Sequence, residues 1–185
     1  MPMRYLAVVG VFLADALLAA APVIVRDDAG LRDFDRPLAG RGRRDAPRMG
    51  DEIARRGWVP DITLVSAARR TRETWMLASK AMGAEVPATF LDSIYEAEWQ
   101  TLLAALRGVD PAIDTALMVG HNPGMEDLAL ELAGGHSSPA ALEALGTKFP
   151  TAAVARLEFD GQWAKLTPGG ARLVDFVQPR DIKSS

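Results

Sequence analysis

Short apolar runs typical of buried strands alternate with helix-like segments along the 185-residue chain, and this alternation restricts the fold more than any other feature. Strands are predicted over residues 4–9, 62–65 and 115–119, with a weaker one over 88–91, and helices over residues 45–56, 70–82, 99–107 and 125–133. Strands separated by helices of this length favour a mostly parallel sheet with helices on both faces. We therefore predict an α/β fold, a three-layer sandwich around a mostly parallel mixed sheet.

The C-terminal part of the sequence has a different pattern. Residues 153–159 and 163–166 flank Asp160-Gly161, a turn sequence typical of a β-hairpin, and residues 173–177 suggest a further short strand. No repeat, low-complexity tract or linker divides the chain, whose length suits one domain. We expect a single domain over residues 1–185, with residues 10–26 as its atypical part.

Capping residues predict where the helices begin and end. Asp45 is expected as the N-cap of the first helix, with Pro47 in its first turn and Gly57 after its end. Gly83 and Gly108 follow the second and third helices in the same way, because glycine readily adopts the conformation that ends a helix.

An apolar stretch near the N-terminus allows two interpretations. Asp15 is its only charged residue between Tyr5 and Val25, and its length would suffice to cross a bilayer or to form a signal peptide. Asp15 at mid-span would cost about 2.5–3.5 kcal/mol on insertion scales, and Pro22 interrupts the run. We favour a buried strand, a short apolar segment and a second strand over residues 22–25, and therefore expect a cytoplasmic protein without membrane contact.

Composition disfavours several classes of function. The chain has no cysteine and only two histidines, His121 and His136, so thiolate chemistry is excluded and a histidine-rich metal site is not expected. A net charge of −3 gives no overall attraction to nucleic acid or anionic lipid. A local arginine cluster without interleaved aromatic residues is interpreted as a solvated helix face. Its members are Arg41, Arg43, Arg44, Arg48, Arg55 and Arg56.

Two polar loops directly follow predicted buried strands. The first runs from Ser66 to Thr74 and contains Arg70, and the second begins with Gly120-His121-Asn122-Pro123. Ligands in open α/β sheets bind beyond the carboxyl ends of the strands, so Arg70 and His121 should converge if both strands are parallel. A guanidinium, an imidazole and the N–H groups of a helix start form an anion site that suits phosphate.

Several segments resemble those of small SixA-type phosphohistidine phosphatases of the histidine phosphatase (phosphoglycerate mutase-like) superfamily. They follow the family's order between residues 27 and 181: DFDRPL at 33–38 with RGRRDAPRMG at 41–50, SAARRTRET at 66–74, YEA at 95–97, VGHNPG at 119–124 and KFPT at 148–151. The resemblance implies the phosphoglycerate mutase-like fold and a phosphatase for a phosphohistidine protein or small phosphoester. It implies no metal and no organic cofactor.

The resemblance also implies roles for individual residues. Arg70 would bind phosphate, and His121 would be the second active-site histidine, which contacts the phosphoryl group and stabilises the transition state. Asn122 stands beside His121 as a further phosphate-binding candidate. Glu96 is a candidate proton donor, with a surface carboxylate as the alternative interpretation. Ser66 is expected to shape its loop.

The sequence departs from the family at the nucleophile. The family's first strand leads directly into an Arg-His motif whose histidine becomes phosphorylated, but no histidine precedes His121 here. At the place expected for the motif after the first strand, residues 9–12 read Val-Gly-Val-Phe. After the second apolar run, Arg26 could bind phosphate while Asp27 occupies the histidine's place. Aspartate there would set a negative charge beside phosphate and would need a metal that the sequence does not indicate. His136 is expected to be a surface loop residue and no replacement nucleophile.

Three hypotheses follow from this departure. The chain is a phosphatase of SixA type with impaired catalysis, or a non-catalytic relative that binds phosphorylated ligands. A third hypothesis is that residues 10–26 reflect a reading-frame error, which resequencing of that DNA segment would test. Of the first two, the phosphatase would use Arg70 and His121 in its pocket, and we expect its catalysis to be impaired or absent in the chain as written. In each case the expected partner is a phosphorylated protein or a small phosphoester, without nucleic acid, and the sequence leaves the oligomeric state open.

Overall fold

The computed structural model describes residues 3–11 and 30–182, and within them one six-stranded sheet. Its strands are β1 (Met3–Val11), β2 (Ile62–Ser66), β3 (Ala88–Leu91), β4 (Thr115–His121), β5 (Val154–Asp160) and β6 (Arg172–Val177). They lie in the order β3-β2-β4-β1-β5-β6. Strands β1 to β4 are parallel, and β5 runs antiparallel to β1 and β6. The predicted mostly parallel mixed sheet is confirmed.

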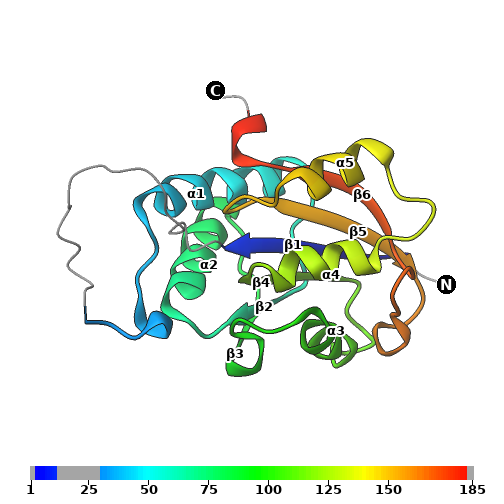
Figure 1. Cartoon of the computed structure of the whole chain (residues 1–185), viewed down its shortest axis with the longest axis horizontal. Helices are drawn as coiled ribbons and strands as arrows, with labels where there is room; N and C mark the ends of the chain where they lie inside the picture. The colour runs from blue at the N-terminus through cyan, green and yellow to red at the C-terminus, as the bar shows by residue number, and fades with distance from the viewer. Residues whose placement is uncertain (1–2, 12–29, 183–185) are drawn as a thin grey trace.

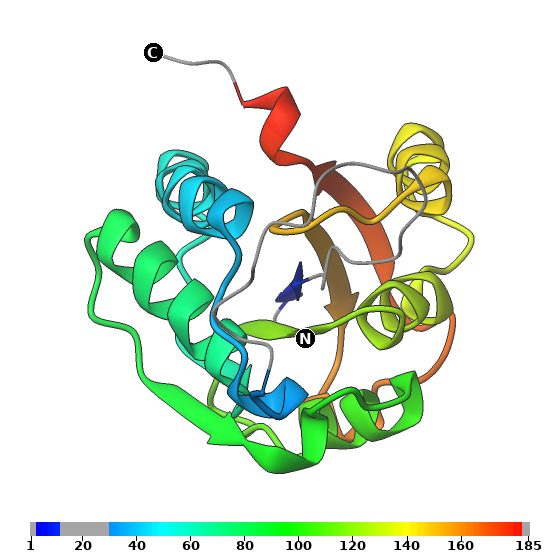
Figure 2. The same ribbon diagram turned by 60° about the vertical axis from the view of Figure 1, so that its left-hand side comes forward.

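Helices cover both faces of the sheet, which confirms the three-layer arrangement. They are α1 (Gly40–Arg55), α2 (Arg69–Met82), α3 (Trp99–Arg107), α4 (Gly124–Leu132) and α5 (Pro139–Thr147). Figure 2 shows α1 and α2 on one side of the sheet and α3, α4 and α5 on the other. Along β4, Leu117 and Val119 join the core under α1 and α2, while Ala116 and Met118 join the core under the other three helices. This alternation is the period-two pattern of a strand buried on both faces.

Strand β1 lies in the middle of the sheet, between β4 and β5 (Figure 1). Leu6 is fully buried, and the buried Arg4 donates to the backbone carbonyls of Pro111, Ile113 and Gly161. The first part of the apolar stretch is therefore a core strand, as favoured above. The second strand expected over residues 22–25 lies outside the described residues. Within the described parts, no helix has both the length and the apolar character needed to cross a bilayer.

The first helix begins earlier than predicted. Ala39 is the N-cap of α1, so Asp45 and Pro47 lie inside the helix rather than at its start. Asp45 is buried and pairs with Arg41 at 3.4 Å and Arg48 at 3.6 Å, one turn to either side. The Asp45 carboxylate is therefore paired with two arginines of its own helix and does not cap a helix N-terminus.

The hairpin partner of β5 also differs from the prediction. Residues 163–165 form a single 3-10 turn, in which buried Trp163 donates from Nε1 to the carbonyl of Ile113 at 2.7 Å. The short strand suggested over 173–177 pairs with β5 instead, as β6. Helix α5 was not predicted, although Ser138, which accepts from the Ala141 N–H, and the following Pro139 are a recognisable helix start.

Candidate active site

Arg70 and His121 meet at the carboxyl edge of the sheet, as the sequence predicts. Arg70 lies in the first turn of α2, directly after β2, and His121 is the last residue of β4. Arg70 is 2% exposed and His121 is 4% exposed. A terminal nitrogen of Arg70 lies 3.0 Å from Nδ1 of His121. The parallel arrangement of β2 and β4 brings their following residues to the same edge, which explains this convergence.

The hydrogen bonds of His121 define its protonation. A guanidinium only donates, so Nδ1 accepts from Arg70 and the ring proton resides on Nε2. Nε2 lies 2.8 Å from the hydroxyl oxygen of Ser66 and donates to it. Burial, together with the charge of Arg70, lowers the pKa of His121 to about 3, although Asp33 acts in the opposite direction. The imidazole is therefore neutral over the physiological pH range.

Ser66 and His121 are at the distance of a nucleophile and its general base, yet the proton is on the wrong nitrogen for that chemistry. A base at Nε2 would need a free lone pair there, and Arg70 directs the proton to that atom instead. Ser66 is also fully buried. This agrees with the expectation that Ser66 shapes its loop, because its carbonyl accepts from the Thr71 hydroxyl in α2.

Asp33 and Tyr95 complete the cluster, although the sequence analysis gave neither a role. Asp33 lies in a 3-10 turn (Asp33–Asp35), and its Oδ2 is 3.0 Å from Arg70 and 2.7 Å from the Tyr95 hydroxyl. Burial opposes ionisation of Asp33, but the Tyr95 hydrogen bond and the Arg70 charge outweigh it and lower its pKa. Burial, and then the bond to Asp33, raise the pKa of Tyr95 to about 12. Tyr95 therefore donates its proton to an ionised Asp33.

Glu96 stands at the mouth of the cluster. Its Oε1 lies 3.3 Å from Arg70, and its side chain is 50% exposed. Its backbone has φ of 47°, a left-handed conformation that strains a residue other than glycine. Gly124 at the start of α4 permits this turn, because a Cβ there would overlap the carbonyl oxygen of Ala97. The arrangement presents the Glu96 carboxylate to solvent beside Arg70, and its role as a proton donor stays a prediction.

Asn122 lies next to His121, where the sequence places it, but its amide is used inside the protein. Nδ2 donates to Glu126 and to the carbonyl of Phe149, each at 3.2 Å, and Oδ1 is buried with no partner in residues 3–11 and 30–182. Burial, followed by the charge of Asp127, raises the pKa of Glu126. The only signal for Glu126 in the sequence is an acid in the first turn of a helix, a common preference that carries no functional information. Phosphate binding by Asn122 stays a prediction.

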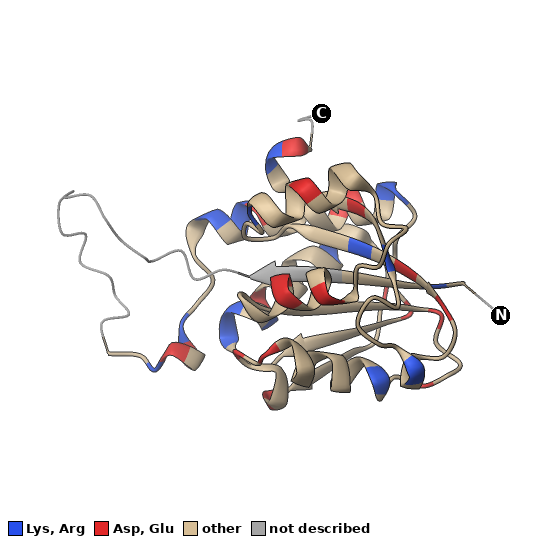
Figure 3. Cartoon of the chain, turned by 45° about the vertical axis from the view of Figure 1, so that its right-hand side comes forward, with Lys and Arg blue, Asp and Glu red and all other residues tan. Residues whose placement is uncertain are grey.

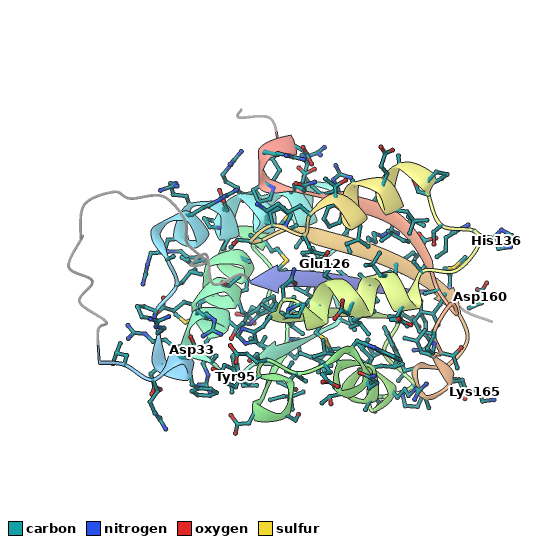
Figure 4. All side chains as sticks on the ribbon, viewed as in Figure 1. Asp33, Tyr95, Glu126, His136, Asp160 and Lys165 are labelled. Atoms are coloured by element: carbon teal, nitrogen blue, oxygen red, sulfur yellow. The ribbon has the colours of Figure 1, made fainter. Side chains whose placement is uncertain are left out.

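Other predicted residues lie elsewhere. Arg26 and Asp27 are outside the described residues. His136 is exposed at the opposite edge of the sheet from Asp33 and Tyr95, as the labels in Figure 4 show, which agrees with the expected surface position.

The arginine cluster extends along α1, where Figure 3 shows blue segments at the beginning of the helix. Five of its six members pair with carboxylates of Asp45, Glu52 or Glu73. This pairing is what a solvated, charge-balanced helix face requires.

The backbone register places the end of β1 next to His121. In the parallel pairing of β1 with β4, Gly10 is opposite Gly120 and Val11 is opposite His121. The described part of the first strand therefore ends in Gly10-Val11, next to the backbone of His121.

Comparison with known proteins gives relatives in sequence and in structure. No family model matches the chain. An uncharacterised protein of Mycobacterium tuberculosis (strain H37Rv) is 38% identical over 152 residues, covering 82% of this chain and 94% of that protein. An uncharacterised chloroplastic protein of Arabidopsis thaliana is 31% identical over 171 residues, covering 83% of this chain and 72% of that protein.

Solved structures similar to this chain come from one family of phosphatases. A protein proposed to be the phosphohistidine phosphatase SixA of Nakamurella multipartitia superposes with a TM-score of 0.74 at 28% identity, covering 97% of this chain and 98% of that one. Its counterpart from Agrobacterium tumefaciens gives 0.70 at 29% identity, covering 97% and 99%. A SixA protein histidine phosphatase complexed with tungstate shares the fold, with a TM-score of 0.68 at 20% identity and coverage of 98% and 99%. The fold and these likenesses are those of the histidine phosphatase superfamily, and the neighbours at 28% and 29% identity are SixA-type proteins.

Proposed function

We propose that this chain binds the phosphoryl group of a phosphohistidine protein or a small phosphoester at Arg70 and His121, and that it hydrolyses that group poorly or not at all. The observation that carries the proposal is the meeting of a buried arginine and a neutral histidine beside a strand end without a histidine. The Arg70–His121 pair supports binding, and the missing first active-site histidine argues against turnover.

Binding is supported by the donors gathered at the start of α2. Arg70 is held there by its neighbours, and its Nε is buried without a hydrogen-bond partner among the described residues. A buried guanidinium at a helix N-terminus favours an anion, through both its own charge and the free backbone N–H groups. The SixA names of the structural relatives, at 28% and 29% identity, indicate a phosphorylated protein as the ligand class.

Poor turnover follows from where the two histidines lie. A covalent phosphohistidine intermediate needs a neutral imidazole nitrogen with a free lone pair aimed at phosphorus. In His121, Nδ1 accepts from Arg70 and Nε2 carries its proton toward Ser66. His136 is at the other edge of the sheet. Neither histidine of this chain offers such a nitrogen to a phosphoryl group bound at Arg70.

Hydrolysis of a phosphohistidine peptide tests the proposal, with binding followed in parallel by fluorescence anisotropy. We expect the wild type to bind the labelled phosphopeptide more tightly than its unphosphorylated form, and Arg70→Ala to lose this preference. Phosphate release should equal that of His121→Ala. Wild-type turnover that His121→Ala abolishes would overturn the claim of lost catalysis, and an equal affinity for both peptides would overturn the claim of binding.

A gain-of-function variant sharpens the test. The register puts residues 10 and 11 beside Gly120 and His121, so Gly10→Arg/Val11→His sets an Arg-His pair at the strand end. We expect this variant to release phosphate faster than the wild type. Gly10→Arg/Val11→Ala is the matched control, which lacks only the nucleophile and should stay at background.

A further inference from the structure

The terminal N–H groups of Arg70 are already occupied by the protein itself. One terminal nitrogen donates to the Asp33 backbone carbonyl at 2.8 Å and lies 3.0 Å from the Asp33 carboxylate. The other donates to His121 at 3.0 Å and to Glu96 at 3.3 Å. Both terminal nitrogens are therefore engaged, by three hydrogen bonds and the ion pair with Asp33, while Nε is buried without a partner in the part of the chain that the structure describes. A phosphoryl group that binds the terminal nitrogens of Arg70 competes with these acceptors.

We propose that the Asp33 carboxylate is an internal competitor of the phosphoryl group, and that Asp33, held in place by Tyr95, sets the affinity of the pocket for phosphate. This inference rests on the proposed function, because it concerns the same Arg70 site. It adds a residue that determines ligand affinity, with an effect opposite to that of Arg70.

Geometry singles out Asp33 among the acceptors. The backbone carbonyl of Asp33 carries no net charge, and His121 is neutral. Of the two carboxylates, Glu96 is more exposed and more distant from the guanidinium, with side-chain exposure of 50% against 35% and a distance of 3.3 Å against 3.0 Å. Only Asp33 is clamped on its other side by a neutral donor, the Tyr95 hydroxyl at 2.7 Å.

Two arginines and a phenol hold Asp33 in its ionised form. Arg70 and Arg36 lie at 3.0 Å and 3.7 Å from its oxygens. The Tyr95 hydroxyl donates to its carboxylate at 2.7 Å, and the Tyr95 ring packs edge-on against Phe34 at 5.0 Å, which fixes the phenol. A second anion at Arg70 would meet this fixed negative charge within a few ångströms, which disfavours binding.

Removal of the charge without loss of the hydrogen bond isolates the effect. In Asp33→Asn the side-chain oxygen still accepts from Tyr95, and the backbone carbonyl still accepts from Arg70. We expect inorganic phosphate to bind this variant about tenfold more tightly than the wild type, a change worth about 1.4 kcal/mol. A gain in affinity is the opposite of what structural damage would produce.

The experiment is isothermal calorimetry of inorganic phosphate against the wild type, Asp33→Asn, Tyr95→Phe and Arg70→Ala at one ionic strength. Tyr95→Phe removes the hydrogen bond to the Asp33 carboxylate but leaves its charge. We therefore expect a smaller rise in phosphate affinity than for Asp33→Asn. Asp35→Asn is the matched control, because Asp35 lies in the same 3-10 turn but pairs with the exposed Arg32. Its phosphate affinity should equal that of the wild type.

The outcomes separate the inference from the function on which it rests. Equal or weaker binding by Asp33→Asn, with wild-type binding intact and lost in Arg70→Ala, overturns the inference alone. A rise in Asp35→Asn as large as in Asp33→Asn also overturns it, because surface charge in general would then be responsible. Absence of binding in all the variants overturns both the inference and the proposed phosphate site.

Discussion

His121 shows how a single residue acquires its properties from its neighbours. Arg70 donates to one ring nitrogen, Ser66 accepts from the other, and Tyr95 packs edge-on at 5.3 Å. A histidine in water would titrate near 6.5, but here burial and the arginine keep the ring neutral down to a pKa of about 3. The chemistry of the site therefore depends on contacts that involve three separate segments of the chain.

This depressed pKa predicts a pH dependence of stability. Between about pH 6.5 and 3, the unfolded state binds a proton at residue 121 that the folded state does not, so the free energy of unfolding falls as pH falls. The slope from this group approaches about 1.4 kcal/mol per pH unit. Urea unfolding of the wild type and His121→Asn at several pH values measures it. The variant should lack this component, and equal slopes in the two proteins would contradict the assignment.

At the residue scale, the sequence allowed prediction of Arg70 and His121, because each directly follows a recognisable buried strand. Asp33 and Tyr95 could not be given roles in the same way. Both lie in irregular segments, and their contact spans 62 positions in sequence. Only the packing of the folded chain shows that a tyrosine and an arginine share one carboxylate.

At the scale of elements, the close approach of α4 to the turn that carries Glu96 positions the mouth of the site. Gly124 begins α4, and any side chain there would collide with the backbone at Ala97. The strained φ of Glu96 and the absence of a Cβ at 124 are thus two parts of one contact.

We predict that Gly124→Ala destabilises the protein by about 2–4 kcal/mol, because backbone atoms must move to relieve the overlap. Gly146→Ala is the matched control: it lies within α5 and a Cβ there meets nothing within 4 Å. Alanine at 146 should stabilise by up to about 1 kcal/mol through helix propensity. Denaturant melts measure both changes, and similar values for the two variants would rule out the proposed contact.

Element boundaries proved harder to predict than element types. The parallel strands and most helices follow from apolar periodicity, but the start of α1 does not, because Asp45 is a common capping residue that is buried here between two arginines. The prediction of a hairpin over residues 153–166 was wrong for a related reason. Residues 163–166 have a strand-like pattern, yet residues 163–165 form a 3-10 turn whose Trp163 packs in the core against Phe159.

At the scale of the whole molecule, the sheet depends on a first strand that is central rather than peripheral. Strand β1 pairs with β4 on one side and β5 on the other, and Leu6 joins the core beneath α3, α4 and α5. Because residues 3–11 form a strand in the middle of the sheet, loss of this strand would separate β4 from β5.

Leu6→Ala should therefore destabilise the whole domain by about 2–5 kcal/mol, in one cooperative transition. Leu130→Ala is the comparison, since Leu130 lies on α4 and is 39% exposed. Its substitution should change stability by less than about 0.5 kcal/mol. Thermal unfolding followed by circular dichroism distinguishes them, and an unchanged melting temperature in Leu6→Ala would contradict a core position for β1.

The most direct test of binding without turnover is a ³¹P NMR spectrum of a phosphohistidine peptide mixed with stoichiometric protein. One spectrum reports binding, through the shift and width of the phosphohistidine line, and hydrolysis, through the line of inorganic phosphate. We predict a perturbed phosphohistidine line with the wild type, an unperturbed one with Arg70→Ala, and no phosphate beyond spontaneous release. Phosphate that accumulates with the wild type but not with His121→Ala would contradict the account.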